Sequence, residues 1–208
     1  MTGAEGEIAL VGADVSRETK ARLAELVALI AKWNTAINLV SKTTIDQIWS
    51  RHILDSVQIF SFGQTAGHWA DLGAGGGLPG LVVAILAAEK APHMRITLVE
   101  SDQRKAVFLR QASQALGLAT HVACDRIEAL APLNADVISA RALAALPQLC
   151  GFAKRHLSED GMAIFLKGKS FGAELADAKK AWNFILTPHA SATDPSAVVL
   201  VLKGIAHV

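Results

Sequence analysis

Asp71-Leu72-Gly73-Ala74-Gly75-Gly76-Gly77-Leu78-Pro79-Gly80 is the stretch that decides the fold, because five of its ten residues are glycine in a chain that has only 16. Residues 68–70 before it are typical of a β-strand, and the apolar run 81–88 after it is typical of a helix. A glycine-rich turn between a strand and a helix lets the backbone approach a ligand closely, since no Cβ is in the way. The helix N-terminus adds free N–H groups and a partial positive charge. We therefore expect a nucleotide-like cofactor here.

Two cofactor classes fit this glycine loop. Residues 75–80 match the dinucleotide fingerprint G-x-G-x-x-G, and Glu100 follows at the distance of a ribose-binding acid. Residues 71–77 instead match D-x-G-x-G-x-G, the acid-led pattern of S-adenosylmethionine methyltransferases. The ammonium group of S-adenosylmethionine favours a nearby acid such as Asp71, which would also hold the loop, whereas a pyrophosphate would be repelled by it. The acid favours S-adenosylmethionine, but Glu100 suits the ribose of either cofactor, so the loop alone leaves both open.

The composition is that of a folded protein of 208 residues, with 51% hydrophobic and 19% charged residues. Its net charge of +1 neither requires nor excludes a nucleic-acid partner, so a phosphate contact must come from a local patch. The first residues lack the basic region of a signal peptide, and no apolar run reaches the roughly 20 residues of a membrane helix. Cys124 and Cys150 lie apart, so we expect two at least partly buried thiols and no disulfide. These features predict a cytoplasmic protein without a membrane contact.

The chain changes character after its first third. We expect residues 1–15 to form a mobile arm, Ser16 to cap a helix, and a second helical pattern to run over residues 44–60. After that, short β-like runs alternate with helices, which predicts an α/β fold with a parallel sheet and helices on both faces. We divide the chain into an N-terminal helical extension, residues 1–65, and a cofactor-binding domain, residues 66–208.

The ends of the expected strands carry the candidate ligands. Ligands of parallel sheets bind beyond the C-terminal ends of the strands, so Asp71, Glu100, Cys124 and Ser139 should line one crevice. The expected strands are residues 69–72, 95–100, 121–124, 136–139 and 162–167, with two closing strands at 183–188 and 197–202. The expected helices between them are residues 78–89, 102–116, 142–156 and 171–182.

Basic residues also gather near these strand ends. Arg141 follows the fourth strand, where an arginine is costly unless it holds an anion or a planar acceptor, and Lys167 adds charge to the same rim. In the helical half, Arg51 and His52 place polar groups on an otherwise apolar helix. Ordinary salt bridges and a capped surface helix remain the alternatives for these residues. Because His52 has no second histidine at metal-ligand spacing, we expect no metal site.

A set of motifs follows one order between about residues 30 and 170. The segment Arg51-His52-Ile53-Leu54-Asp55-Ser56, joined to the loop ending Gly77-Leu78-Pro79-Gly80, is its most specific part. The other motifs are Trp33-Asn34, Asn38-Leu39, Val99-Glu100-Ser101, Arg104-Lys105, Phe108-Leu109, Ala140-Arg141-Ala142 and Lys167-Gly168. Together they resemble the ribosomal RNA small subunit methyltransferase G family, also called glucose-inhibited division protein B. The chain departs from the family at Val40, where threonine is frequent, and at Ala74, where serine or threonine is common.

The resemblance implies a class I S-adenosylmethionine-dependent methyltransferase fold, Rossmann-like, with an N-terminal helical extension. It implies transfer of a methyl group from S-adenosylmethionine to N7 of a guanosine in the 530 loop of 16S ribosomal RNA. By the family pattern, cofactor contacts fall on Gly73, Leu78, Ile127, Glu128 and Arg141, Glu100 meets the ribose, and the loop pattern adds Asp71, Gly75 and Gly77.

This chemistry needs no acid or base residue, because guanine N7 carries an exposed lone pair in the plane of the ring. The enzyme has to align N7, the methyl carbon and the sulfur, and the target base has to leave its stack. Candidates to hold guanine O6 or flanking phosphates are Arg51, His52, Arg141 and Lys167. The low net charge predicts weak binding to naked RNA, so we expect the partner to be 16S ribosomal RNA within the small ribosomal subunit or its precursor. We also expect a monomer.

Two rival functions stay open at this point. The first is a NAD-dependent oxidoreductase that uses the G-x-G-x-x-G register, although no residues for a hydride acceptor stand out. The second is a non-catalytic ribosome-assembly factor that keeps the glycine loop as a vestige.

Overall fold

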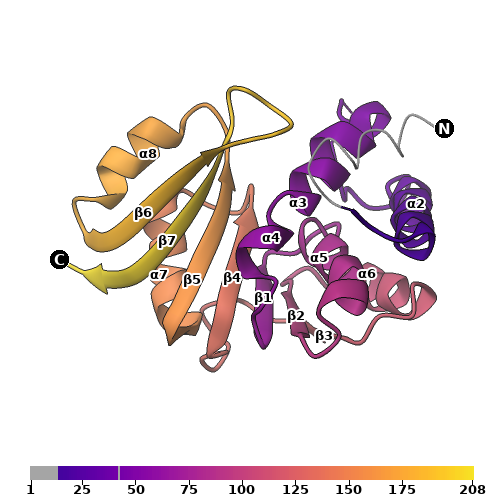
Figure 1. Cartoon of the computed structure of the whole chain (residues 1–208), viewed down its shortest axis with the longest axis horizontal. Helices are drawn as coiled ribbons and strands as arrows, with labels where there is room; N and C mark the ends of the chain where they lie inside the picture. Colours follow the sequence, from indigo (N-terminus) through magenta and orange to yellow (C-terminus); the bar gives the residue numbers. More distant parts are fainter. Residues whose placement is uncertain (1–13, 42) are drawn as a thin grey trace.

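The computed structural model describes residues 14–41 and 43–208, in which one seven-stranded sheet carries helices on both faces (Figure 1). The strand order is β3-β2-β1-β4-β5-β7-β6, and the five strands from β3 to β5 are parallel. β7 runs antiparallel to both of its neighbours. The strands are β1 (His68–Leu72), β2 (Arg95–Val99), β3 (Thr120–Ala123), β4 (Ala135–Arg141), β5 (Leu157–Lys167), β6 (Trp182–Ala190) and β7 (Val198–His207).

The class I methyltransferase architecture expected from the sequence is therefore confirmed, with local differences. β5 begins at Leu157, five residues earlier than expected, and α7 (Leu146–His156) begins four residues later, because Ala142 takes a left-handed conformation with φ of 52°. Cys150 is buried, but the expectation of burial is wrong for Cys124, which follows the edge strand β3 and is exposed. The arm expected at residues 1–15 lies largely outside the described residues, although Val15 is buried.

Successive side chains of the central strands pack into two separate hydrophobic cores, one on each face of the sheet. Val137 of β4 packs with the first core, together with α2 (Arg17–Trp33), α5 (Gly80–Lys90) and α6 (Gln103–Ala115). Its neighbour Ile138 packs with the second core, together with α7 and α8 (Phe171–Ala178). This is the period of two expected for a sheet that is buried on both faces. No helix of the described part of the chain is long and apolar enough to cross a membrane.

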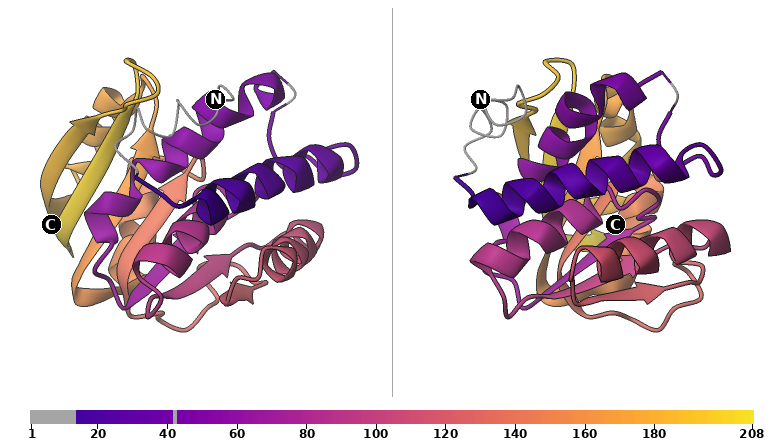
Figure 2. Two further views of the ribbon diagram at one scale, coloured as in Figure 1. Left: turned by 45° about the vertical axis from the view of Figure 1, so that its right-hand side comes forward. Right: turned by 90° about the vertical axis from the view of Figure 1, so that its right-hand side faces the viewer.

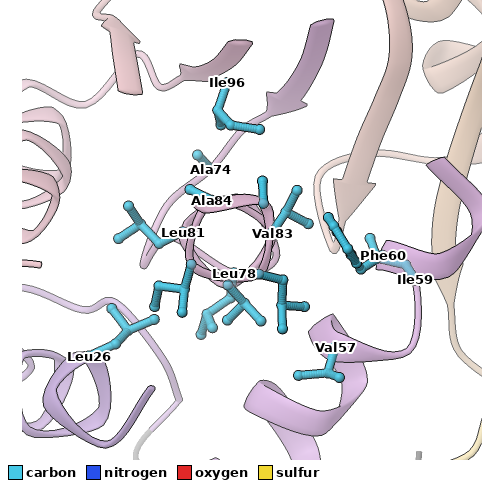
Figure 3. Packing of buried hydrophobic residues seen from close by; sticks show 14 of the residues in the cluster. Leu26, Val57, Ile59, Phe60, Ala74, Leu78, Leu81, Val83, Ala84 and Ile96 are labelled. Carbon is cyan, nitrogen blue, oxygen red and sulfur yellow. The ribbon is translucent and has the colours of Figure 1, made fainter. Parts of the chain in front are cut away.

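The helix that follows the glycine loop is buried on every side as far as Ala87. All residues from Gly80 to Ala87 of α5 are buried, which is the pattern of a helix surrounded by protein. Figure 3 shows its side chains pointing outward all round, toward Leu26 of α2, Ile96 of β2 and Phe60 of α4 (Phe60–Gly63). α2, which is capped by Ser16 as expected, lies across α5 and α6 (Figure 2). The N-terminal helices thus supply the outer cover of the helix that carries the glycine loop.

The second helical pattern, expected over residues 44–60, is not one helix. It consists of short pieces in three hydrogen-bond registers: η1 (Ile45–Gln47) is a 3₁₀ turn, η2 (Trp49–Leu54) is a π-helix, and α3 (Asp55–Val57) and α4 are short α-helical turns. The Ser56 hydroxyl donates to the carbonyl of His52 at 2.7 Å and competes with the backbone for that acceptor. π-Helical turns are frequent at functional sites, and this one carries Arg51 and His52.

The loop between β6 and β7, residues 191–197, reaches back to this broken helix (Figure 1). Gln58 donates to the Ser191 hydroxyl at 3.3 Å and accepts from the Ala192 N–H at 2.9 Å. The Thr193 hydroxyl donates to Asp55 at 3.1 Å. We call residues 191–197 the hairpin loop. These contacts place the C-terminal hairpin beside the N-terminal helices, above the C-terminal ends of β4 and β5.

Candidate functional site

The glycine loop is held from below by Asp71. Its Oδ2 accepts from the Gly80 N–H at 2.9 Å, and its Oδ1 accepts from the Ser139 hydroxyl at 2.6 Å. The Ser139 oxygen accepts in turn from Trp69 Nε1 at 2.9 Å. Burial raises the pKa of Asp71 to about 7, opposed by these hydrogen bonds. Asp71 is 1% exposed and Ser139 fully buried, so the expectation that both line the crevice is wrong: they form its floor.

Three glycines of the loop take left-handed conformations. Gly73, Gly75 and Gly77 have φ values of 67°, 52° and 78°, a region in which other residues are strained. At Gly73 the space is also closed, because a Cβ would lie 2.6 Å from Leu143 Cδ1. The loop conformation therefore requires glycine at these positions.

Glu100 joins the end of β2 to the same loop. Its Oε2 accepts from the Gly75 N–H at 2.9 Å and its Oε1 from the Asp102 N–H at 2.8 Å. Asp102 caps α6, because its side chain accepts from the N–H groups of Arg104 and Lys105. Each carboxylate oxygen of Glu100 keeps a second lone pair for a hydroxyl group.

A cavity of about 180 Å³ lies beyond the ends of β1, β2 and β3. Three of the predicted cofactor residues line it: Gly73, Ile127 and Glu128. Gly75 and Gly77 belong to the same loop as Gly73, and Glu100 follows the lining residue Val99, but none of the three lines the cavity. Leu78 is buried in the first core. The rest of the lining is Val99, Ser101, Asp125, Arg126, Leu143, Ala144, Gln148 and Phe152.

Sequence reasoning missed the contribution of α7 to this cavity. Gln148 and Phe152 are spaced i, i+4 and therefore share one helical face. That spacing was visible in the sequence but does not distinguish a cavity wall from a core. The end of α7 also fixes the opposite wall: His156 Nε2 donates to the Ile127 carbonyl at 2.9 Å, and Arg155 donates to the Leu130 carbonyl at 2.7 Å.

A second, larger cavity of about 610 Å³ lies beyond the ends of β4 and β5. Three of the predicted substrate-positioning residues line it: Arg51, Arg141 and Lys167. The hairpin loop forms part of its wall through Ser191, Thr193 and Asp194, which sequence reasoning did not assign. Arg141, which the family pattern places at a cofactor contact, lines this larger cavity instead of the smaller one.

Each of these three basic residues is paired with a carboxylate of the same cavity. Lys167 Nζ lies 2.6 Å from Glu174 Oε2, Arg141 Nη1 lies 3.5 Å from Asp55 Oδ2, and Arg51 Nη2 lies 3.9 Å from Asp194 Oδ2. Burial raises the pKa of Asp55 and lowers that of Arg141, while their mutual attraction opposes both shifts. The charged lining is thus balanced: three cations face three carboxylates.

His52 is not brought into this cavity. Its Nε2 lies 2.8 Å from the Thr44 hydroxyl, and its Nδ1 is buried without a partner among the described residues. Burial, followed by the nearby Arg141 and Arg51, lowers the pKa of His52 to about 4. His52 is therefore a neutral side chain outside the lining of the larger cavity.

The two cavities meet at the segment that follows β4. Arg141 and Ala142 line the larger cavity, whereas Leu143 and Ala144 line the smaller one. Lys167 Nζ donates to the Ala144 carbonyl at 3.0 Å, so the partition between the cavities is tied to β5. This geometry places two candidate ligand sites side by side, on either side of residues 141–144.

Comparisons with known proteins agree on one family. The profile of the family described as "GidB: rRNA small subunit methyltransferase G" matches residues 19–194. A curated ribosomal RNA small subunit methyltransferase G from Cereibacter sphaeroides is 51% identical over 97% of this chain and 98% of its own length. The protein of the same name from Ruegeria sp. is 52% identical over 94% and 95%.

Solved structures share the fold at low identity. An O-methyltransferase from Bacillus cereus in complex with SAH has a TM-score of 0.59 and 13% identity, over 88% of this chain and 90% of its own. TYW2 from M. jannaschii in complex with AdoMet has a TM-score of 0.57 and 12% identity, over 84% and 80%. Both are similar to this chain in their fold.

Proposed function

Because the chain belongs to the ribosomal RNA small subunit methyltransferase G family, we propose that it methylates N7 of a guanosine in the 530 loop of 16S ribosomal RNA. The family and fold make it an S-adenosylmethionine-dependent methyltransferase of 16S ribosomal RNA. The observation that carries the finer proposal is the meeting of two cavities at residues 141–144. One cavity suits a nucleoside cofactor, and the other suits an extruded base with its phosphates.

The smaller cavity is the proposed site of the cofactor's adenosine. Ile127 and Phe152 supply apolar contact, and Glu128 supplies backbone and side-chain polar groups. Glu100, whose oxygens keep free lone pairs, is the proposed ribose acceptor. When bound, S-adenosylmethionine supplies an electrophilic methyl group on a sulfonium. Asp71 acts from beneath, by holding the loop that contacts the cofactor.

The larger cavity is the proposed guanosine site. Arg51 is more than half exposed and is suited to a phosphate, whereas Arg141 is mostly buried and is suited to guanine O6. Lys167 is bound to Glu174 and to the Ala144 carbonyl, so its proposed role is to hold the partition. N7 needs no base, and aligned positioning of two bound reactants lowers the barrier by up to about 7–11 kcal/mol.

The balanced charge of the larger cavity supports the small subunit or its precursor as the partner. Three cations that are already paired attract free RNA weakly, so recognition has to come from the shape of the particle. We propose that the protein acts as a monomer in the cytoplasm, where small subunits assemble.

The proposal is tested by mapping 7-methylguanosine in 16S ribosomal RNA by mass spectrometry. RNA from cells that carry the gene should contain the modification in the 530 loop, and RNA from cells without it should lack it. Complementation with Gly73→Glu should fail to restore it, because the side chain would fill the loop beside Leu143. A non-catalytic assembly factor would instead keep its effect with this substitution, and tight NAD binding without a response to S-adenosylmethionine in calorimetry would reject the methyltransferase.

A further inference from the structure

The three carboxylates of the larger cavity differ in how fully they are bound. Glu174 Oε2 accepts from Lys167 and from the Leu146 N–H at 2.9 Å, and its Oε1 accepts from Ser170 at 3.2 Å. Every oxygen of Glu174 is therefore engaged by the fold.

Asp55 is engaged on both oxygens as well. Its Oδ1 accepts from Thr193 at 3.1 Å and from Gln58 at 2.8 Å, and its Oδ2 faces Arg141. Only 17% of its side chain is exposed. Asp55 thus joins the hairpin loop to Arg141, and both of its oxygens already contact donors of the protein.

Asp194 is the exception. Its Oδ1 accepts from the N–H and the hydroxyl of Ser196 at 2.8 and 2.7 Å, whereas its Oδ2 faces only Arg51 at 3.9 Å, beyond hydrogen-bond length. Its side chain is 39% exposed, and the bonds from Ser196 lower its pKa, so Oδ2 is an ionised acceptor. Among the three carboxylates of the larger cavity, Asp194 is therefore the one with an oxygen that accepts no hydrogen bond from the described residues, and it lies beside the half-exposed Arg51.

Resting on the proposed function, we propose that Asp194 is a specificity-determining residue that accepts a hydrogen bond from the 2-amino group of the target guanine. Guanine carries N7 and O6 acceptors on one side of the ring and its 2-amino donor on the other. Adenine lacks that amino group, so a carboxylate at this place selects guanine. Arg51, released from Asp194, becomes available for a phosphate.

The order of the strands determines which edge of the bound guanine faces each wall of the larger cavity. Moving across the sheet from the glycine loop after β1, the cavity walls come from β4 with Arg141, from β5 with Lys167, and then from the hairpin loop before β7. A guanine whose N7 faces the cofactor side directs its 2-amino group toward the hairpin loop. Gln58 and Asp55 fix that loop to the N-terminal helices, so Asp194 is held in place before the base arrives.

The test compares guanosine with inosine, which lacks only the 2-amino group. Small subunits are reconstituted with 16S RNA carrying either nucleoside at the target position, and methyl transfer from labelled S-adenosylmethionine gives kcat/KM. The variant is Asp194→Asn, which keeps the Oδ1 acceptor for Ser196. The matched control is Asp160→Asn, an exposed carboxylate near the opposite end of β5.

We expect the wild type and Asp160→Asn to prefer guanosine over inosine by about tenfold or more, the effect of losing one hydrogen bond to a charged group. Asp194→Asn should lose about tenfold on guanosine and change less than about twofold on inosine. An equal loss on both substrates, or none on guanosine, overturns the role of Asp194. If the wild type leaves guanosine subunits unmethylated, the proposed function fails instead. Unchanged thermal unfolding and cofactor affinity confirm that the variant is folded.

Discussion

The Ser139 hydroxyl bridges Trp69 and Asp71 beneath the glycine loop, donating to Asp71 Oδ1 at 2.6 Å and accepting from Trp69 Nε1 at 2.9 Å. All three side chains are buried. Through Asp71 Oδ2 the network reaches the Gly80 N–H at the start of α5. The position of the loop is thus fixed by polar groups that water does not reach.

Replacing Ser139 by alanine tests this network. Ser139→Ala leaves Trp69 Nε1 and Asp71 Oδ1 buried without a partner, at a cost of about 1–3 kcal/mol for each group. We expect the free energy of unfolding in urea to fall accordingly. Ser61→Ala, at an exposed hydroxyl, is the control and should change it by less than about 0.5 kcal/mol. Equal stability of the two variants would contradict the structural role of the network.

The raised pKa of Asp71 predicts a pH dependence of stability. The folded-state pKa of about 7 lies above the unfolded value of 3.8, so the folded protein binds more protons between these values. The contribution of Asp71 to stability should therefore fall as pH rises from 4 to 7, by up to about 1.4 kcal/mol per pH unit.

The measurement is urea unfolding at several pH values for the wild type and for Asp71→Asn, which cannot titrate. The difference between the two isolates Asp71 from other groups, such as His52, whose lowered pKa has the opposite effect between pH 4 and 6.5. Parallel pH profiles would show that Asp71 does not titrate in this range.

Gly73→Ala should weaken the binding of S-adenosylmethionine. The new Cβ meets Leu143 at 2.6 Å and the residue keeps a positive φ, so either the loop or the wall of the smaller cavity has to move. We expect the dissociation constant from calorimetry to rise by at least about tenfold, equivalent to about 1.4 kcal/mol. Gly172→Ala, where no atom lies within 4 Å, is the control and should bind as the wild type does.

Leu26→Ala should destabilise the whole fold although it lies far from the site in sequence. Leu26 is fully buried against α5, and its truncation leaves a cavity that costs about 2–5 kcal/mol. Chemical denaturation should report this loss, whereas Val107→Ala, at a side chain that is 42% exposed, should cost less than about 1 kcal/mol. Similar losses in both variants would mean that α2 does not share the core.

The sheet and its loop were predictable because their signals are local. The glycines of residues 71–80 and the alternation of strands and helices need no knowledge of distant contacts. Periodicity likewise found the buried face of residues 44–60, but it cannot report hydrogen-bond register, so the π-helix η2 was missed.

The remaining parts of the site depend on contacts across the chain. Asp194 reaches the larger cavity only because the hairpin loop binds Gln58 and Asp55, residues more than a hundred positions away. No local pattern reports such a meeting. In the same way, Arg141 lines the larger cavity next to Ala142, which takes a left-handed conformation. An alanine in the sequence does not predict a positive φ.

The burial of α5 from Gly80 to Ala87 has a thermodynamic consequence. The glycine loop leads directly into α5, and α2 packs against α5. Ligand binding at the loop and the packing of α2 therefore stabilise the same cooperative unit. Linkage then works in both directions: saturating cofactor should slow amide hydrogen exchange in α2, and loosening α2 should lower cofactor affinity at a site that α2 does not line.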